Sequence, residues 1–295
     1  MKPWNEYIFA SSVEDAVAAL SAPGSSAHPI AGGTDLLLEI QQGRRAPAYT
    51  LVDLTRIPEL QRLEQEKDSL SIGAAAPVAC IVTHPLVQAH AQALAEACRL
   101  IGGPQVRNTA TLGGNVAHAL PAADGMIALA ALDAQVEIAG PGGRRWAALL
   151  ELFAAPGKNT LARGEILVRF RVPLRHAGEG SAFDRIMRPQ GVALPILNLA
   201  VWIARQGEYV RAARIAVGPA GPTPRRALEV EELLTGQPWN AELVGRAVER
   251  LRETARFRTS ARRASAEYRY HLGGVLLEDV LTRAWERAGE MEKGQ

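Results

Sequence analysis

At 295 residues, 47% of them hydrophobic and 22% charged, the chain is long enough for two domains and has ample apolar material for a core, so a disordered protein is excluded. Its 33 Lys and Arg against 31 Asp and Glu leave a net charge of +2, which gives no global electrostatic case for nucleic acid or a membrane surface. Two cysteines cannot supply the four thiolates of an iron–sulfur cluster, and no apolar run approaches the roughly 18 residues of a membrane span.

The first quarter of the chain is predicted to alternate short strands with short helices. Ser12 and Asp15 are placed as N-cap and third residue of a first helix over 12–20, and Gly43 ends a second helix that starts at Leu36. Strands are expected around residues 7–8, 29–31, 50–53 and 70–74.

The middle of the chain is expected to be helical and then β-stranded. An Ala-rich segment over 78–100 predicts helix with a break at His84 and Pro85, and a further helix is expected over 121–132. A strand over 135–139 is followed by a glycine-rich hairpin turn, and a strand over 165–172 ends at Pro173. The glycine-containing stretch 176–180 is interpreted as a linker.

The last third predicts strands first and helices afterwards, which is the pattern of an α+β domain. The strands are expected over 183–187, 196–204 and 210–217, and the helices over 224–235, 241–254 and 264–287. Arginines crowd the region between Arg246 and Arg269. We interpret this run as a solvated helical face or as a contact with carboxylates of a partner, because the aromatic residues that a nucleic-acid stripe needs are sparse there.

Two glycine pairs about 80 residues apart are the candidates for ligand binding. Gly32 and Gly33 precede Thr34 and Asp35 at the start of a predicted helix, and Gly113-Gly114 stands between Thr111 and Asn115. Glycine lets a backbone approach an anion closely and present several N–H groups, and a helix start favours phosphate. The same residues also suit an ordinary turn with a helix cap. Neither pair has the spacing of a dinucleotide-binding fingerprint or a P-loop.

These motifs together resemble the flavoprotein subunits of molybdenum hydroxylases, the xanthine dehydrogenase and carbon monoxide dehydrogenase type. The resemblance runs in order from the first glycine turn to the C-terminal helix. It is carried by Ile30-Ala31-Gly32-Gly33-Thr34-Asp35-Leu36, Arg107-Asn108-Thr109-Ala110-Thr111-Leu112-Gly113-Gly114-Asn115, Pro121-Ala122-Ala123-Asp124, Gly164-Glu165-Ile166-Leu167 and Ser265-Ala266-Glu267-Tyr268-Arg269.

The resemblance implies an α+β fold with a two-lobed FAD-binding domain of the vanillyl-alcohol-oxidase type over 1–175 and a smaller C-terminal α+β domain over 180–288. The two lobes would cover about 1–55 and 56–175. Both glycine turns would hold the FAD diphosphate, Asp124 would contact the ribityl chain, and Leu167 would lie by the isoalloxazine. The implied cofactor-binding residues are Ile30, Ala31, Gly32, Gly33, Thr34, Asp35, Leu36, Ile101, Thr111, Gly113, Gly114, Asn115, Asp124, Leu167 and Asp184.

The resemblance departs from the family pattern at three positions. Leu120 stands where relatives often carry Ser before the proline, and His118 replaces a smaller residue. Asp184, beside Arg185, stands where relatives of the xanthine dehydrogenase type often carry Lys. Contacts at the edge of the flavin, and any pyridine-nucleotide contact there, are therefore open.

The implied function is electron transfer without a catalytic side chain or a protein-bound metal. A large molybdopterin subunit would oxidise the substrate, a small subunit with two-iron two-sulfur clusters would pass the electrons on, and the FAD would deliver them to NAD⁺, a quinone or another acceptor. Two alternatives stay open, a stand-alone FAD oxidase of the same fold and a flavin-free assembly subunit. The N-terminal residues do not read as a signal peptide, so a cytoplasmic location is expected.

Overall fold

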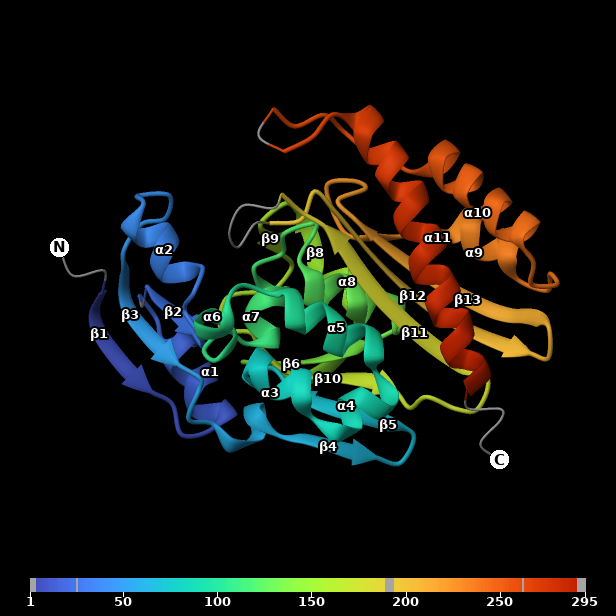
Figure 1. Ribbon diagram of the computed structural model, residues 1–295. Coiled ribbons are helices and arrows are strands. Elements are labelled where there is room, and N and C mark those ends of the chain that lie inside the picture. The colour runs from blue at the N-terminus through green and yellow to red at the C-terminus, as the bar shows by residue number, and fades with distance from the viewer. Residues whose placement is uncertain (1–3, 25, 189–193, 262, 291–295) are drawn as a thin grey trace.

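The computed structural model describes residues 4–24, 26–188, 194–261 and 263–290, which form a small N-terminal lobe, a central lobe and a C-terminal domain in a row (Figure 1). The two lobes correspond to the expected FAD-binding domain and are followed by the expected α+β domain. Arg262 of the arginine run lies outside the described residues. Within the described residues, no helix combines the length and the apolar character that a membrane crossing requires.

The N-terminal lobe is a three-stranded parallel sheet in the order β1-β3-β2 with two helices. The predicted cap of the first helix is confirmed, because the Asp15 amide donates to Ser12 Oγ at 3.0 Å. The glycine turn follows β2 directly and leads into α2. The elements are β1 (Trp4–Phe9), α1 (Val13–Ser21), β2 (Ala27–Ile30), α2 (Leu36–Gln41) and β3 (Ala48–Asp53).

The central lobe is built on an antiparallel sheet in the order β4-β5-β10-β6-β7. Its strands are β4 (Leu63–Glu66), β5 (Ser69–Gly73), β6 (Gln135–Gly140), β7 (Gly143–Ala148) and β10 (Ile166–Pro173), with the small hairpin β8 (Phe153–Ala155) and β9 (Lys158–Asn159). Its α-helices are α3 (Val78–Thr83), α4 (Pro85–His90), α5 (Gln92–Leu100), α6 (Pro104–Arg107), α7 (Leu112–Ala117) and α8 (Asp124–Ala131). Two 3-10 helices, η1 (Pro58–Gln61) and η2 (Leu149–Leu152), complete the lobe.

The expected break at His84 and Pro85 is present, and a second break at Ala91 divides the Ala-rich segment into three helices. The hairpin between β6 and β7 forms at the predicted glycines, with Gly140 opposite Gly143. The short helices α6 and α7 were not predicted. They have four and six residues, too few for a periodic apolar pattern to show in the sequence.

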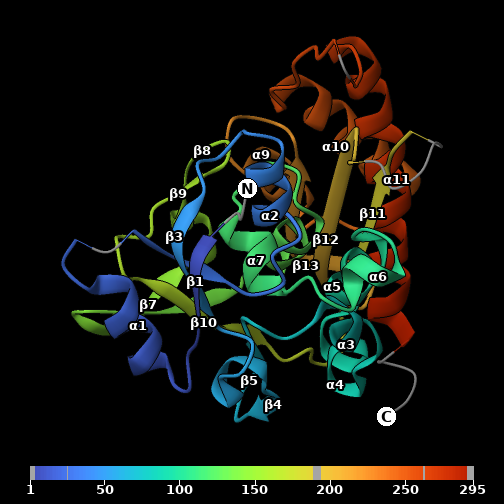
Figure 2. The same cartoon turned by 90° about the vertical axis from the view of Figure 1, so that its left-hand side faces the viewer.

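The C-terminal domain is a four-stranded antiparallel sheet, β11-β12-β13-β14, with an apolar layer on each face. One face packs on α9, α10 and α11, and the other packs on α5 and α8 of the central lobe (Figures 1 and 2). The elements are β11 (Glu179–Ile186), β12 (Leu197–Gln206), β13 (Tyr209–Gly218), β14 (Arg225–Arg226), α9 (Leu228–Leu234), α10 (Ala241–Thr254) and α11 (Ala266–Glu290).

The predicted linker over 176–180 was wrong at its end, because Glu179 and Gly180 belong to β11. Gly180 pairs with Ile203 across the sheet and is covered by α11. A Cβ at this position would overlap the carbonyl oxygen of Ala284 and lie 2.6 Å from the amide nitrogen of Ala288. The glycine permits close packing of a helix on a strand, and the connection between the domains is the shorter stretch 174–178.

This packing predicts a large effect of Gly180→Ala on stability. The added methyl group must push α11 away from β11, so we expect a loss of about 2 to 3 kcal/mol in the free energy of unfolding. Gly245→Ala is the matched control, because Gly245 lies inside α10 with open space around it, and Ala should stabilise that helix by up to ~1 kcal/mol. Urea unfolding of both variants measures the difference. Equal stabilities would contradict the close packing of α11 on Gly180.

Candidate functional site

The two glycine turns, which are far apart in sequence, lie against each other in the structure. The turn after β2 passes so close to the segment before α7 that a Cβ on Gly32 would overlap the carbonyl oxygen of Thr109 and lie 2.7 Å from Ala110 Cα. Only glycine permits this approach of two backbones. The N-terminal lobe is therefore joined to the central lobe at the place where the sequence predicts a ligand.

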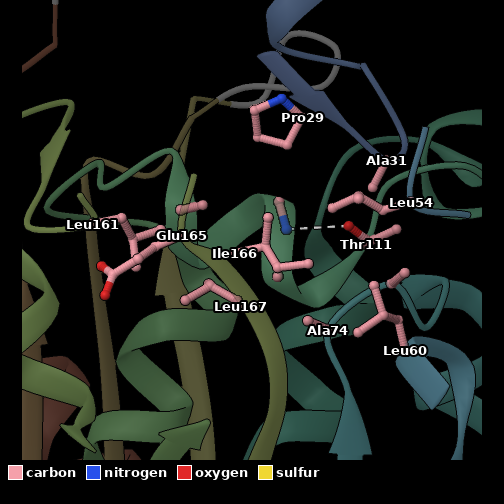
Figure 3. Close-up of a pocket in the computed structure, with 14 residues that line it drawn as sticks. Pro29, Ala31, Leu54, Leu60, Ala74, Thr111, Leu161, Glu165, Ile166 and Leu167 are labelled. Carbon is pink, nitrogen blue, oxygen red and sulfur yellow. Dashed lines mark hydrogen bonds between the residues drawn. The ribbon is translucent and has the colours of Figure 1, made fainter. Parts of the chain in front are cut away.

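A pocket of about 110 Å³ opens beside this contact. Figure 3 shows it between the turn after β2, the start of α7 and the first residues of β10. Five of the expected cofactor residues line it, and these come from all three segments. They are Ala31, Thr111, Gly113, Gly114 and Leu167. The remaining walls are mostly apolar: Pro29, Leu54, Leu60, Ala74, Ala75, Ala117, Leu161, Glu165 and Ile166.

The first turn presents a row of free main-chain donors. Within the described residues, the amides from Gly32 to Leu36 donate to no protein acceptor, and the regular bonds of α2 begin with the Leu37 amide donating to the Gly33 carbonyl. Gly33 has a φ of +66°, a left-handed conformation that turns successive amides toward one side. A run of unsatisfied donors at a pocket is suited to an anion such as a diphosphate.

The second turn uses its own amides differently. The Gly113 amide donates to the Ala74 carbonyl at 2.8 Å, and the Gly114 amide donates to Thr111 Oγ1 at 3.1 Å (Figure 3). The first bond holds α7 against the residue that follows β5, and the second caps the start of α7, where Thr111, Gly113 and Gly114 line the pocket. Asn115 retains an unused group, since its Oδ1 is buried and has no hydrogen-bond partner. A buried polar atom without a partner is costly and indicates that a ligand can satisfy it.

Leu167 lines the pocket at the start of β10 with 6% of its surface exposed. The expected apolar wall is thus present at this position. The carboxylate of the neighbouring Glu165 is bound by Arg145, with 3.1 Å between Arg145 Nη2 and Glu165 Oε1. The charge next to the apolar wall is therefore neutralised by a partner within the protein.

Ile101 and His118 both contact other residues of the protein near the two glycine turns. Ile101 caps the end of α5, and its carbonyl accepts a hydrogen bond of 3.2 Å from Arg107 Nη1. His118 lies at the end of α7, with Nε2 3.1 Å from Glu39 Oε1 and Nδ1 3.7 Å from Asp35 Oδ2. The histidine thereby ties α7 to α2, which fixes the second turn relative to the first.

Asp124 lies in a buried polar cluster between the central lobe and the C-terminal sheet. Its Oδ2 is 2.5 Å from Arg185 Nη1, and its Oδ1 accepts a hydrogen bond of 2.7 Å from Asn198. Burial raises the pKa of Asp124 above its ordinary value, and the Arg185 charge and the Asn198 amide oppose that shift. The cluster also contains unused atoms, because Arg185 Nε and Asn198 Oδ1 are buried without partners.

Asp184 points to the opposite side of the sheet. Strand β11 alternates, so that Phe183 and Arg185 face the central lobe while Asp184 faces α11, where its Oδ2 lies 3.2 Å from Arg283 Nη2. The placement does not support Asp184 as a cofactor residue, and Arg185 takes the place facing the cluster. The period of two along a strand shows from the sequence that Asp184 and Arg185 lie on opposite faces, but not which face meets the cluster.

In the part of the chain that the structure describes, no group of three or more acidic, histidine or cysteine residues lies close enough to hold a metal ion. The pocket instead combines nearby main-chain donors with an apolar wall, as nucleotide-cofactor pockets do, whereas the Asp124 cluster is not among the residues that line it.

Comparisons with known proteins agree with this geometry. Residues 3–175 match the family model described as the FAD binding domain in molybdopterin dehydrogenase, and residues 181–284 match that of the CO dehydrogenase flavoprotein C-terminal domain. The chain is 33% identical to the carbon monoxide dehydrogenase medium chain of Hydrogenophaga pseudoflava over 97% of this chain and 98% of that one. It is 31% identical to a putative xanthine dehydrogenase FAD-binding subunit of Escherichia coli, over 96% and 97% of the two chains.

A solved structure of carbon monoxide dehydrogenase from Hydrogenophaga pseudoflava shares the fold of the whole chain. It superposes with a TM-score of 0.91 at 33% identity, and the alignment covers 97% of this chain and 99% of that chain. The similarity includes both lobes and the C-terminal domain. The overall arrangement of these parts is therefore common to both proteins.

The buried cluster predicts unequal effects of two aspartate substitutions. Asp124→Asn leaves the Arg185 guanidinium buried without a counter-charge, so we expect the free energy of unfolding to fall by about 3 to 5 kcal/mol. Asp184→Asn is the matched control, since its ion pair with Arg283 is half exposed and should contribute less than ~1 kcal/mol. Urea unfolding at neutral pH gives both values, and equal losses would contradict the assignment of Arg185 to the buried face.

Proposed function

The chain belongs to the family of FAD-binding subunits of molybdopterin dehydrogenases, and from this membership we propose that it serves as the electron relay of a molybdenum hydroxylase complex. Its cofactor is FAD, and the complex to which it belongs is an oxidoreductase. The route of the electrons, the partner subunits and the final acceptor are our proposal. The main support for this proposal is the close contact of Gly32 with Thr109. Unpaired main-chain amides and a pocket lie next to that contact.

The residues present fit the cofactor on three counts. The amides of the first turn supply the donors that a diphosphate requires, and the pocket next to them is open and largely apolar. Gly32 has no room for a side chain, so the cradle depends on its missing Cβ. Buried unsatisfied atoms on Asn115, Arg185 and Asn198 offer polar partners deeper in the molecule.

We assign the diphosphate to the turn from Ile30 to Leu36, with the α7 segment from Thr111 to Asn115 closing the other side. Leu167 would form the apolar wall beside the isoalloxazine. Asp124 would take the ribityl side through the cluster it forms with Arg185 and Asn198. Ile101, which lies at the edge of the same lobe, would line the pocket for the adenosine or the flavin.

The protein's part in the reaction is placement. FAD, when bound, supplies chemistry that can take electrons singly and release them in pairs. The first turn holds the diphosphate, and the apolar residues at the start of β10 exclude water from the flavin. The Asp124–Arg185 pair limits how far the cofactor extends toward the C-terminal domain. No proton transfer by a side chain is needed for a relay, and electrons would enter from an iron–sulfur subunit that is served by a molybdopterin subunit. NAD⁺, a quinone or another carrier would accept them, and the three subunits would form a heterotrimeric unit in the cytoplasm.

Two alternatives lead to different experiments. A stand-alone oxidase of the same fold would oxidise a small alcohol or amine directly on the flavin. A flavin-free assembly subunit would have the fold without the cofactor. The free amides and the open pocket favour a chain that holds its flavin, and the absence of a charged or nucleophilic group among the described pocket walls other than the paired Glu165 favours a relay.

A charge at the first turn should expel the cofactor. Gly33→Asp places a carboxylate beside the diphosphate. The φ of +66° strains any side chain at this position, but Asp and Asn adopt it more readily than other residues, and the two variants share the same strain. We expect retention of FAD to fall at least tenfold, measured as flavin absorbance per protein after gel filtration. Gly33→Asn has the same size without the charge and should keep most of the flavin. Equal flavin content in the two variants would contradict the assignment of the turn to the diphosphate.

Gly113 is a poorer choice for such a test. A Cβ there would lie 2.6 Å from the Ala74 carbonyl oxygen, so Gly113→Asp should disturb the packing of α7 on β5 whether or not a cofactor is present. We expect that variant to unfold at a lower temperature in addition to losing flavin. Circular dichroism separates it from Gly33→Asp, which should unfold near the temperature of the flavin-free Gly33→Asn variant, because both carry the same backbone strain.

The relay and the oxidase differ in what reduces the flavin. The purified single chain, loaded with FAD and kept anaerobic, should be bleached by dithionite but not by small alcohols, small amines, xanthine or carbon monoxide. In the intact complex, the substrate of the molybdenum subunit should bleach the flavin as well. Rapid bleaching of the isolated chain by an alcohol or amine would support the oxidase and overturn the relay.

A further inference from the structure

A buried arginine without a partner marks the start of α11. Arg269 is one of the largest fully buried side chains, with 2% of its surface exposed, and its Nε has no hydrogen-bond partner. No carboxylate of the described residues forms an ion pair with it. An uncompensated buried guanidinium is unusual, because burying a charge is costly unless it is paired.

Further arginines surround Arg269. Burial lowers the pKa of Arg269, and the charges of Arg263 and Arg258 lower it further, so the three guanidinium groups are close enough to repel one another. Arg188, at the end of β11, reaches the same place and donates to the Arg263 carbonyl at 3.3 Å. None of these arginines pairs with a described acidic residue. Among the other described arginines of the run, Arg250 pairs with Glu253 and Arg252 pairs with Glu249, whereas Arg246 and Arg256 pair with no described acidic residue.

These residues come from two connections that meet at one end of the C-terminal domain. The chain between α10 and α11 carries Arg258 and Arg263, and it projects beyond the sheet at the top of Figure 1, at the end where β11 stops. Exposed large hydrophobic side chains lie next to these arginines, Met187 and Leu194 between β11 and β12 and Tyr268 in the first turn of α11. Met187 has 38% of its surface exposed, Leu194 57% and Tyr268 48%.

The composition of this surface fits a protein partner. Arginine, tyrosine and methionine are enriched at protein interfaces, and exposed apolar side chains next to charges are typical of a contact surface. We define the arginine surface as Met187, Arg188, Leu194, Arg258, Arg263 and Tyr268, with Arg269 beneath it. Its positive charge favours binding of carboxylates, which guanidinium groups bind through two parallel hydrogen bonds.

The hydroxyl groups at the start of α11, which could add to a phosphate site, are already engaged within the protein. Thr259 Oγ1 accepts from the Ala266 amide at 3.0 Å, and Ser265 Oγ accepts from the Tyr268 amide at 3.2 Å. Glu267 adds a negative charge to the first turn of α11. This end of α11 is thus capped by side chains of the protein itself. The unpaired positive charge lies on the arginine side chains of the surrounding surface.

We propose that the arginine surface docks a carboxylate-bearing segment of a partner subunit. The inference rests on the proposed function, because it takes the chain to be one subunit of a complex. Acidic side chains of the partner would pair with Arg258 and Arg263, and their charge would compensate the buried Arg269. The apolar residues Met187, Leu194 and Tyr268 would be covered at the same time.

The test uses the complex purified by a tag on this chain, with its subunits identified by mass spectrometry. In Arg258→Lys and Arg263→Lys complexes, a carbodiimide should join the new lysine to an Asp or Glu of a partner subunit. Arg246→Lys is the control, because Arg246 is exposed on α10 about two turns before its end and should give no such link. The Arg258→Glu/Arg263→Glu double variant should lower the affinity for the partner at least tenfold, while Arg246→Glu should not. Both variants should keep their flavin.

The outcomes separate the docking surface from the proposed function. A double variant that assembles like the wild type, together with no link from either lysine to a partner, overturns the docking surface alone. If inorganic phosphate raises the Tm of the wild-type chain but not of Arg263→Glu, and no link forms, the surface binds a free anion and the proposal is likewise overturned. A wild-type chain that carries no flavin and no partner subunit overturns the relay function and the docking surface with it.

Discussion

The approach of the Gly32 backbone to Thr109 and Ala110 is the constraint on which the site depends. It joins a parallel three-stranded lobe to a central antiparallel sheet without a side chain between them. The turn after β2 can therefore leave its amides unpaired at the lobe boundary, where water or a ligand must satisfy them. His118 strengthens the same junction by linking α7 to α2 through Glu39 and Asp35. The cofactor cradle is thus a property of how two lobes meet.

A second junction joins the central lobe to the C-terminal domain. The sheet of the C-terminal domain lies on α5 and α8, where the Ala93 amide donates to Ser181 Oγ at 3.2 Å and the Phe183 amide donates to Glu96 Oε2 at 2.8 Å. The Asp124–Arg185 pair is buried in this interface. Burying charges in an interface contributes less to stability than to specificity, so the pair would serve to set one relative position of the domains. A cofactor bound between the two lobes would then meet the C-terminal domain in one fixed position.

The outer end of the C-terminal domain has the opposite character. Arginines there are left without carboxylates, and apolar side chains are left exposed, although the rest of the chain pairs most of its buried charges. Glu231, for example, is buried but is matched by Arg226 at 2.5 Å. The chain pairs its buried charges in one region and leaves arginines unpaired in another. Such a distribution is suited to a subunit that contacts a partner through the unpaired charges.

The sequence by itself determined the local elements, because capping residues, apolar periods and turn glycines act over a few neighbouring positions. The Ser12 cap, the bounds of α10 and the Gly140–Gly143 hairpin follow from such signals. The order of motifs also identified the family. Only the tertiary structure decided the close approach of Gly32 to Thr109 and the helix covering Gly180, since a glycine in sequence does not show what lies against it. It also decided that Arg185, and not Asp184, faces Asp124, because the side a strand residue takes depends on which face is buried against another element.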